Sequence, residues 1–223
     1  MALNSNKLPA SKGMNITPMP PGTYPARSVM VADLGLQPQG AWQGKERPPA
    51  YKVALTYEFV DEFLKDENDK DMLDKPRWLT EIMPIYPLSA ERAKSTARYN
   101  TLDPEGKYKG DFSKLADIPV MITVVHNPNR KKPGTVWENI GEVAPMRQKD
   151  AEKCPKLVNK VLVFDMDTPD FDVFVALPRF VQRLIVGGLE FEGSKLEEVL
   201  AEKNYSVESE EKVEGDGPTE NPF

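Results

Sequence analysis

The sequence predicts a mainly β protein: a five-stranded Greek-key barrel with one inserted helix, a C-terminal helical extension and a disordered acidic tail. Three observations lead to this prediction. Short apolar runs alternate with polar residues at the period of β-strands, one segment between the third and fourth runs has a helical pattern, and acidic residues concentrate at the end of the chain. The 223 residues suffice for one sizeable β domain with extensions.

Composition divides the chain into three parts. Residues 1–21 are rich in Asn, Ser, Lys, Pro and Gly and are predicted to form a flexible arm, residues 22–204 the folded domain, and residues 205–223 the tail. One cysteine, Cys154, and one histidine, His126, are too few for a disulfide framework or a Cys/His zinc site. Because the sequence has neither an apolar run of 18 residues nor a signal-peptide pattern, we expect a cytoplasmic protein without a membrane partner, a metal or a cofactor.

The first three strands are predicted from alternation and from the turn formers between them. The first covers Tyr24–Leu34 and is followed by a Pro- and Gly-rich loop, Gln37–Pro49. The second, Tyr51–Phe59, has the clearest period of two, which places its last residue in the core. An exposed hairpin tip, Asp61–Lys75, leads to the third strand, Trp78–Ile85.

A helix is predicted after the third strand, with Ser89 as its N-cap. A short second helix or turn covers Asp111–Leu115. The fourth and fifth strands are predicted at Val120–Val125 and Val136–Val143, and a loop of turn formers and bases, Asn127–Gly134, joins them. Three strands, a helix and two further strands follow the order of an OB-fold.

The C-terminal extension is predicted to be mostly helical. Lys156–Phe164 is expected to form one more strand or an extended wrap. Helices are predicted at Phe171–Leu177 and Arg179–Ile185, and Ser194 is the predicted cap of a last helix, Lys195–Glu202.

Charge is segregated along the chain. The formal net charge is −6, but residues 205–223 hold six acids and one base and carry −5, which leaves −1 for the remainder. Residues 75–160 hold 16 Lys or Arg against 10 Asp or Glu. This separation predicts a basic surface suited to an anionic ligand and an acidic string that reaches toward other partners.

The basic surface is predicted to be a single-strand binding groove in which Trp78, Trp137 and the basic loop 130–132 meet. Cations would neutralise phosphates, and aromatic rings would stack on bases with about 1–3 kcal/mol per base and little sequence preference. The candidates are aromatic, cationic or imidazole side chains on the predicted strands and loops: Tyr24, Arg27, Tyr51, Lys52, Arg77, Trp78, Tyr86, Lys107, Tyr108, Lys109, His126, Arg130, Lys131, Lys132 and Trp137. About half of such aromatics are core residues, because a period of two places alternate side chains inside.

The tail, residues 206–223, is too polar to bury a core. Its tip, Glu220, Asn221, Pro222 and Phe223, combines acids with a rigid proline and an aromatic ring. A partner pocket with an apolar slot and a cation can bind such a tip. The acids can also steer the tail toward basic partners or fill the protein's own groove.

An acidic end that closes with Pro-Phe resembles the ending of bacterial single-stranded DNA-binding proteins and of phage replication proteins of this type. Five internal segments are similar to phage single-stranded DNA-binding proteins: 118–126, 136–146, 156–159, 164–171 and 177–178. The resemblance covers roughly residues 20–190 and the tail. It implies an OB-fold, sequence-independent binding of single-stranded DNA during replication, recombination and repair, recruitment of replication or repair proteins by the tail, and a place in the host cytoplasm if the protein is phage-encoded. The tip departs from the bacterial pattern, because Glu220-Asn221 stands where that pattern favours Asp-Ile.

Catalysis is not expected. The sole histidine lacks an evident nucleophile partner, and the sequence has no phosphate-binding loop or dinucleotide fingerprint. The run Asp165, Asp167, Asp170, Asp172 could hold two metals only if its carboxylates converged, whereas one Pro-interrupted loop favours helix capping. Two alternatives stay open: an OB-like adaptor or DNA-mimic inhibitor that binds no nucleic acid, and a metal-dependent nuclease. A monomer and a homodimer are both compatible with the sequence.

Overall fold

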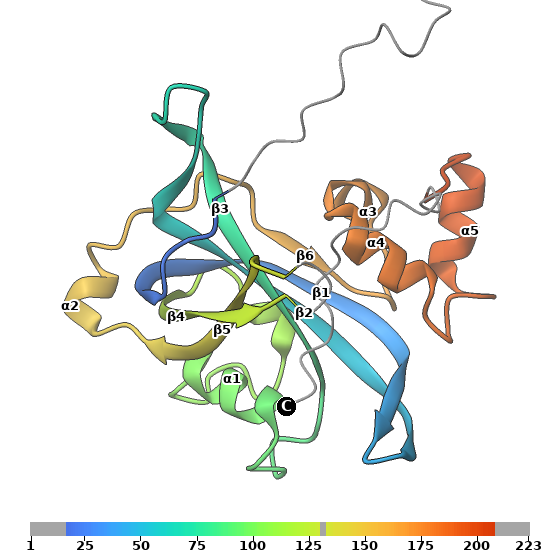
Figure 1. The fold of residues 1–223 in the computed structure, drawn as a ribbon. Helices are drawn as coiled ribbons and strands as arrows, with labels where there is room; N and C mark the ends of the chain where they lie inside the picture. Colours follow the sequence, from blue (N-terminus) through green and yellow to red (C-terminus); the bar gives the residue numbers. More distant parts are fainter. Residues whose placement is uncertain (1–16, 130–132, 208–223) are drawn as a thin grey trace, which may run out of the picture.

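A six-stranded sheet forms the centre of the protein, as Figure 1 shows. The computed structural model describes residues 17–129 and 133–207. Five strands pair antiparallel in the order β3-β2-β1-β4-β5, and β6 pairs parallel with β1. Their bounds are β1 (Gly22–Trp42), β2 (Lys45–Lys65), β3 (Asp71–Pro84), β4 (Pro119–Pro128), β5 (Val136–Pro145) and β6 (Leu162–Phe164). The prediction of a mainly β fold is confirmed.

The hairpin formed by β1 and β2 is much longer than predicted. The predicted loop Gln37–Pro49 continues both strands as a two-stranded ribbon, in which Trp42 pairs with Lys45. Side chains tie the ribbon together, because Arg47 Nε donates to the Gly40 carbonyl at 2.8 Å. Prolines 48 and 49 fit here because they lie at a register shift, between the pairs Gln37↔Ala50 and Gln39↔Arg47, where the hydrogen-bond ladder is interrupted.

The second hairpin differs from the prediction in the same way. Most of the expected tip, Asp61–Lys75, belongs to β2 and β3. The turn itself is confined to residues 66–70, where the Asp66 carboxylate accepts hydrogen bonds from the N–H groups of Asn68 and Lys70. A charged sequence thus forms strand wherever its backbone groups find partners across the hairpin.

The inserted helix begins later than predicted. α1 (Lys94–Leu102) starts after Ala93 without a side-chain cap, so the prediction that Ser89 is the N-cap is wrong. Residues 87–93 form successive turns instead, with Ala90 N–H bonded to the Pro87 carbonyl at 2.8 Å. The short 3-10 helix η2 (Phe112–Lys114) lies where a short helix or turn was predicted.

The C-terminal helices agree closely with the prediction. α3 (Phe171–Ala176), α4 (Arg179–Val186) and α5 (Lys195–Glu202) lie together on one side of the sheet in Figure 1, and Ser194 caps the last of them. The short α2 (Gln148–Ala151) was not predicted, and strand structure in 156–164 is limited to β6. None of the helices in the described ranges is long and apolar enough to cross a membrane.

Two hydrophobic cores share the strands β1 and β2. The first core lies against α1 and contains Val53, Leu55, Tyr57 and Phe59 from alternate positions of β2. The second core contains Ala54 from the opposite face and packs against β6 and the C-terminal helices. The prediction that Phe59 is a core residue is confirmed. Both faces of the central strands are therefore buried, which leaves the ends of the sheet and its loops for binding.

The folded part extends past the predicted domain boundary at residue 204. Tyr205 packs edge-on against Phe171, with ring centroids 5.6 Å apart. Its hydroxyl accepts a hydrogen bond from Arg179 Nη1 at 2.6 Å and donates to Gln182 Oε1 at 2.9 Å. Tyr205 therefore anchors the end of α5 and does not belong to the tail.

Candidate nucleic-acid interface

The outer face of β2 and β3 is covered by the C-terminal part of the chain. Glu58 on β2 is 1% exposed. Its carboxylate accepts hydrogen bonds from Val158 N (2.6 Å), Asn159 Nδ2 (2.8 Å) and Trp78 Nε1 (3.0 Å). Trp78, predicted to stack on bases, packs instead against the second core. Two contacts fix the Trp78 side chain here. Its ring is partly buried against the second core, and its indole N–H donates a hydrogen bond to Glu58.

Two candidate cations make internal contacts. Lys52 is 6% exposed, and its ammonium donates to the Pro38 carbonyl at 3.2 Å. Arg27 Nη1 donates to the main-chain oxygen and to the carboxylate of Asp117, both at 2.7 Å, and its Nε donates to the Pro155 carbonyl at 2.9 Å. Lys52 thus ties β2 to β1, and Arg27 ties two loops to β1. Neither side chain presents its charge to a ligand.

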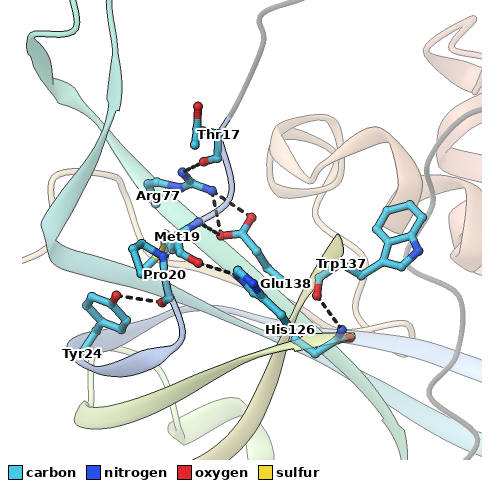
Figure 2. A network of polar contacts seen from close by, with 9 residues as sticks. Thr17, Met19, Pro20, Tyr24, Arg77, His126, Trp137 and Glu138 are labelled. Carbon is cyan, nitrogen blue, oxygen red and sulfur yellow. Dashed lines mark hydrogen bonds and ion pairs between the residues drawn. The ribbon is translucent and has the colours of Figure 1, made fainter. Parts of the chain in front are cut away.

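A third group of candidates binds the residues that precede β1, as Figure 2 shows. Arg77 on β3 forms an ion pair with Glu138 on β5, at 2.8 Å between Nη2 and Oε2. Arg77 Nη1 also donates to the Thr17 carbonyl at 2.6 Å, and His126 Nε2 donates to the Met19 carbonyl at 2.7 Å. The edges of β3 and β5 are thus linked by an ion pair, and the N-terminal residues lie across that link.

Residues 17–21 therefore differ from the flexible arm to which the sequence assigned them. The Met19 side chain is 2% exposed and belongs to the first core. The Tyr24 hydroxyl donates to the Pro20 carbonyl at 2.8 Å, and the Tyr24 ring packs edge-on against Phe59. Trp137 lies next to this network in sequence, but Figure 2 shows its ring pointing away from it. The Trp137 ring is therefore not part of this network.

The exposed aromatic candidates lie where β2 and β3 separate. Tyr51 is 53% exposed and Tyr86 is 41% exposed. Their backbones are adjacent, because Ile85 N–H donates to the Tyr51 carbonyl at 2.8 Å. Ser95 Oγ in α1 accepts from Tyr86 N–H at 3.2 Å, which fixes the segment after β3 against the helix.

A loop that is held by hydrogen bonds to its own backbone, residues 103–110, follows α1 and carries Lys107 and Lys109 together with Asp103 and Glu105. The Asp103 carboxylate accepts from the N–H groups of Lys107 and Tyr108, each at 2.8 Å. Desolvation acts to raise the pKa of Asp103, but these hydrogen bonds outweigh it and hold the pKa below its usual value. The ammonium of Lys107 lies 5.3 Å from the centre of the Tyr108 ring. The loop therefore holds its cations on a fixed backbone.

Leu88 connects the two parts. Its Cδ1 lies 3.6 Å from the position that a Cβ on Gly110 would occupy, so the segment after β3 touches the loop 103–110. Gly110 has φ +93°, a conformation that favours glycine. We call this set the tyrosine–lysine surface; it comprises Tyr51, Tyr86, Leu88, Lys107, Tyr108 and Lys109, and it is joined through the backbone bond between Ile85 and Tyr51 and through the approach of Leu88 to Gly110. Sequence analysis named all of these residues except Leu88, and the one local signal for it was its place directly after Pro87, just past the end of β3.

Acidic side chains border the tyrosine–lysine surface near Tyr51. The Tyr51 hydroxyl donates to Glu190 Oε1 at 2.7 Å. This hydrogen bond and the charge of Glu190 raise the pKa of Tyr51, and the charges of Asp167 and Asp33 act in the same direction. A polyanion would therefore extend from Tyr51 toward the lysines and away from these carboxylates.

Seven of the candidate residues lie outside the described ranges: Arg130, Lys131, Lys132, Glu220, Asn221, Pro222 and Phe223. The residues on either side of 130–132 are described, and Asn129 N–H donates to the Thr135 carbonyl at 3.0 Å. That bond places the loop at the end of the β4–β5 hairpin, as the sequence predicts.

Two of the aspartates after β6 have structural roles: Asp165 closes a turn, and Asp170 caps α3. Asp165 Oδ2 accepts from the Thr168 hydroxyl at 3.0 Å, and Asp170 Oδ1 accepts from Asp172 N–H at 2.8 Å at the start of α3. Within the described ranges, no group of three or more His, Cys, Asp or Glu side chains is arranged to hold a metal ion.

The described residues thus form a mainly β protein in which two exposed tyrosines lie where β2 and β3 separate, and the segment after β3 reaches a loop with two exposed lysines. Comparison of the chain with protein-family models, with curated proteins and with solved structures gave no match.

Proposed function

We propose that the protein binds single-stranded DNA without sequence preference, and that its tyrosine–lysine surface contacts the strand. The observation that carries the proposal is the exposure of Tyr51 and Tyr86, together with the approach of the segment after Tyr86, through Leu88, to the loop that carries the exposed Lys107 and Lys109. A ring more than two-fifths exposed offers a stacking platform, and the adjacent cations can neutralise the phosphates on either side of a stacked base. Bases in a duplex are already stacked, so this chemistry favours single strands.

We propose that the fold is an OB-fold, and the connectivity of the strands supports this. The order β3-β2-β1-β4-β5 and a helix between β3 and β4 match the connectivity of that Greek-key barrel. The Arg77–Glu138 ion pair links the two edge strands, β3 and β5, which do not pair through their backbones in the described residues. The ribbon of β1 and β2 and the β4–β5 loop then correspond to the two loops that flank an OB-fold ligand.

The ribbon would extend the contact beyond the tyrosines. Lys45 and Arg47 are exposed near its tip, on the same strand as Tyr51. Because several phosphates would be neutralised at once, binding would release counterions and weaken steeply with salt.

The acidic tail would supply the second part of the function. Residues 208–223 carry all six acids of the chain's end and its Pro-Phe tip. We propose that they recruit replication or repair proteins while the folded part protects the strand, a role suited to phage DNA replication, recombination and repair. This role is one of binding and not of catalysis.

One finding favours an alternative. The outer face of β2 and β3, where OB-folds usually hold their ligand, is covered by residues 157–164 and the C-terminal helices. An adaptor or DNA-mimic inhibitor with no nucleic-acid affinity would have no need of that face. Direct measurement of strand binding separates the two functions.

Fluorescence anisotropy of labelled oligo-dT tests the proposal. The intact chain should bind at low salt and lose affinity as salt rises, and Tyr86→Ala should weaken binding by about 5- to 150-fold, the equivalent of about 1–3 kcal/mol for one stacked base. Val158→Ala is the control, because Val158 is also an exposed side chain but lies in the segment that covers β2 and β3. A chain shortened after Val207 should bind more tightly, since it loses the tail's acids.

Three outcomes would contradict the proposal. No binding of oligo-dT at low salt would favour the adaptor or inhibitor. Equal reductions in affinity for Tyr86→Ala and Val158→Ala would show that the strand lies elsewhere on the protein. Cleavage of the oligonucleotide in the presence of Mg²⁺ would indicate a nuclease.

A further inference from the structure

The connection between α4 and α5, residues 187–194, is held against β1 at a defined register. Gln37 on β1 is 5% exposed, and its side-chain amide donates to the carbonyls of Leu34 (2.6 Å) and Leu184 (2.9 Å). Leu189 N–H then donates to the Leu36 carbonyl at 2.8 Å. β1 therefore binds the end of α4 through a side chain and the residues that follow through a backbone bond, which fixes where the connection lies along the strand.

Gly188 allows the close approach of this connection to β1. A Cβ at this position would lie 2.8 Å from Gln37 Nε2 and 3.4 Å from the Leu34 carbonyl oxygen. The Gln37 amide cannot move aside without losing the two hydrogen bonds that it donates. Any side chain at this position would therefore push the connection away from the strand.

The register brings Glu190 to Tyr51. Leu36, which accepts the backbone bond from Leu189, is paired with Tyr51 in the β1–β2 hairpin. The next residue of the connection, Glu190, reaches the same place, and its Oε1 accepts the hydrogen bond from the Tyr51 hydroxyl at 2.7 Å. The C-terminal extension, whose helices lie on one side of the sheet in Figure 1, thus supplies a side chain to the tyrosine–lysine surface.

This hydrogen bond holds a ring that core packing does not fix. Tyr51 is 53% exposed and is a member of neither hydrophobic core of the described residues. A free side chain loses rotamer freedom when a base stacks on it, and immobilising one side chain on binding costs about 2- to 12-fold in affinity. A bond to the hydroxyl restricts the ring beforehand and leaves it exposed, so the cost falls before the strand arrives.

The same carboxylate also opposes strand binding. Its charge repels phosphates, and the charges of Asp33 and Asp167 act on the Tyr51 hydroxyl in the same direction as that of Glu190. Two effects of opposite sign therefore meet at Glu190, because the hydrogen bond prepares the ring and the charge repels the strand. They can be separated experimentally, since Glu190→Gln removes the charge and keeps a hydrogen-bond acceptor.

We propose that Glu190 is a positioning residue of the strand-binding site, which holds the Tyr51 ring by its hydroxyl in the orientation that receives a base. This inference rests on the proposed function, because the ring belongs to the tyrosine–lysine surface. The C-terminal extension then contributes to strand binding through one residue and does not only cover the sheet.

A double-mutant cycle in fluorescence anisotropy of labelled oligo-dT tests this role. Glu190→Gln and Glu190→Ala both remove the charge, but only Glu190→Gln keeps an acceptor for the Tyr51 hydroxyl, so Glu190→Ala should bind about 2- to 12-fold more weakly. Combined with Tyr51→Phe, which keeps the ring and removes the hydroxyl, the two substitutions should give equal affinities. Glu192→Gln and Glu192→Ala are the matched controls and should bind equally, because Glu192 is an exposed acid of the same connection that does not accept the Tyr51 hydrogen bond.

An NMR titration of the Tyr51 hydroxyl gives a reading that does not involve DNA, and Tyr51→Phe identifies its signal. The hydrogen bond to Glu190 raises the pKa of Tyr51, so Glu190→Ala should lower this pKa toward its usual value. Gly188→Ala moves the connection without altering either partner, and it should both lower the pKa of Tyr51 and weaken strand binding. Circular dichroism confirms that each variant is folded, and if Gly188→Ala is not, the cycle decides.

Equal affinities of Glu190→Ala and Glu190→Gln would overturn the proposal, because the carboxylate would then act by repulsion alone. So would a difference that persists in Tyr51→Phe, or an unchanged pKa of Tyr51 in Glu190→Ala. The unaltered full chain separates this inference from the proposed function. A chain that binds oligo-dT without coupling between the two positions contradicts only the role of Glu190, whereas a chain that does not bind it contradicts the proposed function and this role with it.

Discussion

Removal of the Glu58 carboxylate should release the C-terminal segment from the outer face of the sheet. Glu58→Ala leaves three donors without their acceptor: Val158 N–H, the Asn159 side-chain amide and the Trp78 indole N–H. Each donor left unpaired in a buried site costs about 1–3 kcal/mol. Water can replace the acceptor at half-exposed Val158, so we take the low end for each and expect a loss of about 3 kcal/mol in all.

Thermal unfolding followed by circular dichroism measures this loss. For a domain of this size, about 3 kcal/mol corresponds to a Tm lower by about 6–12 °C. Trypsin supplies a local reading, because Lys156 and Lys160 are exposed and flank the segment that Glu58 holds. Cleavage there should become faster in Glu58→Ala at temperatures well below its Tm.

Glu142→Ala is the matched control, because Glu142 is also a strand carboxylate but faces solvent on β5. Its effect should stay within about 0.5 kcal/mol. A loss below about 1 kcal/mol for Glu58→Ala, or unchanged trypsin cleavage, would refute the view that this carboxylate clamps the segment to the sheet.

Three further predictions concern pH, salt and packing. Burial raises the pKa of the Asp33 carboxyl. The folded state therefore holds this proton more tightly than the unfolded state does, and stability should fall as pH rises from about 4 through the raised pKa. In urea unfolding Asp33→Asn should remove that fall, and a steeper fall in this variant would contradict the prediction. Replacing Lys107 and Lys109 by Ala should lower the salt slope of oligo-dT binding by about 0.7 for each phosphate that is no longer neutralised, and an unchanged slope would exclude these lysines from the strand-binding surface. Gly141→Ala should cost about 1–3 kcal/mol in thermal unfolding, because the new Cβ would lie 2.8 Å from Val125 Cγ1; unchanged stability would mean that the valine moves aside freely.

Local patterns predicted the elements well where one short segment contains the whole signal. The alternation of Tyr51–Phe59 identified the central part of β2 and the burial of Phe59. The Ser194 cap predicted the start of α5, because capping involves only the next three residues. Ser89 misled for the opposite reason: the turns after Pro87 use the same residue types as a cap, and only packing decides where the helix begins.

The candidate site was harder to predict because its partners are distant in sequence. Trp78 beside two cations has the composition of a stacking site, and nothing local indicates that Glu58 and a segment 100 residues beyond it cover the ring. Met19 lies in a segment whose composition predicts flexibility, yet one buried side chain and four hydrogen-bonded backbone groups suffice to fix it. Tyr51 and Tyr86 were among many equivalent candidates, and only the exposed fractions of their rings distinguish them.

The shared wall of the two hydrophobic cores has a consequence for how the chain can be divided. β1 and β2 contribute alternate side chains to both hydrophobic cores. Neither core can therefore form without the strands that complete the other. A fragment that stops before β6 would leave Ala32, Leu34 and Ala54 facing water, and such a surface drives aggregation. The sheet and its helical cover are therefore expected to unfold in a single transition, and a ribosome would have to release nearly the whole chain before either core could form.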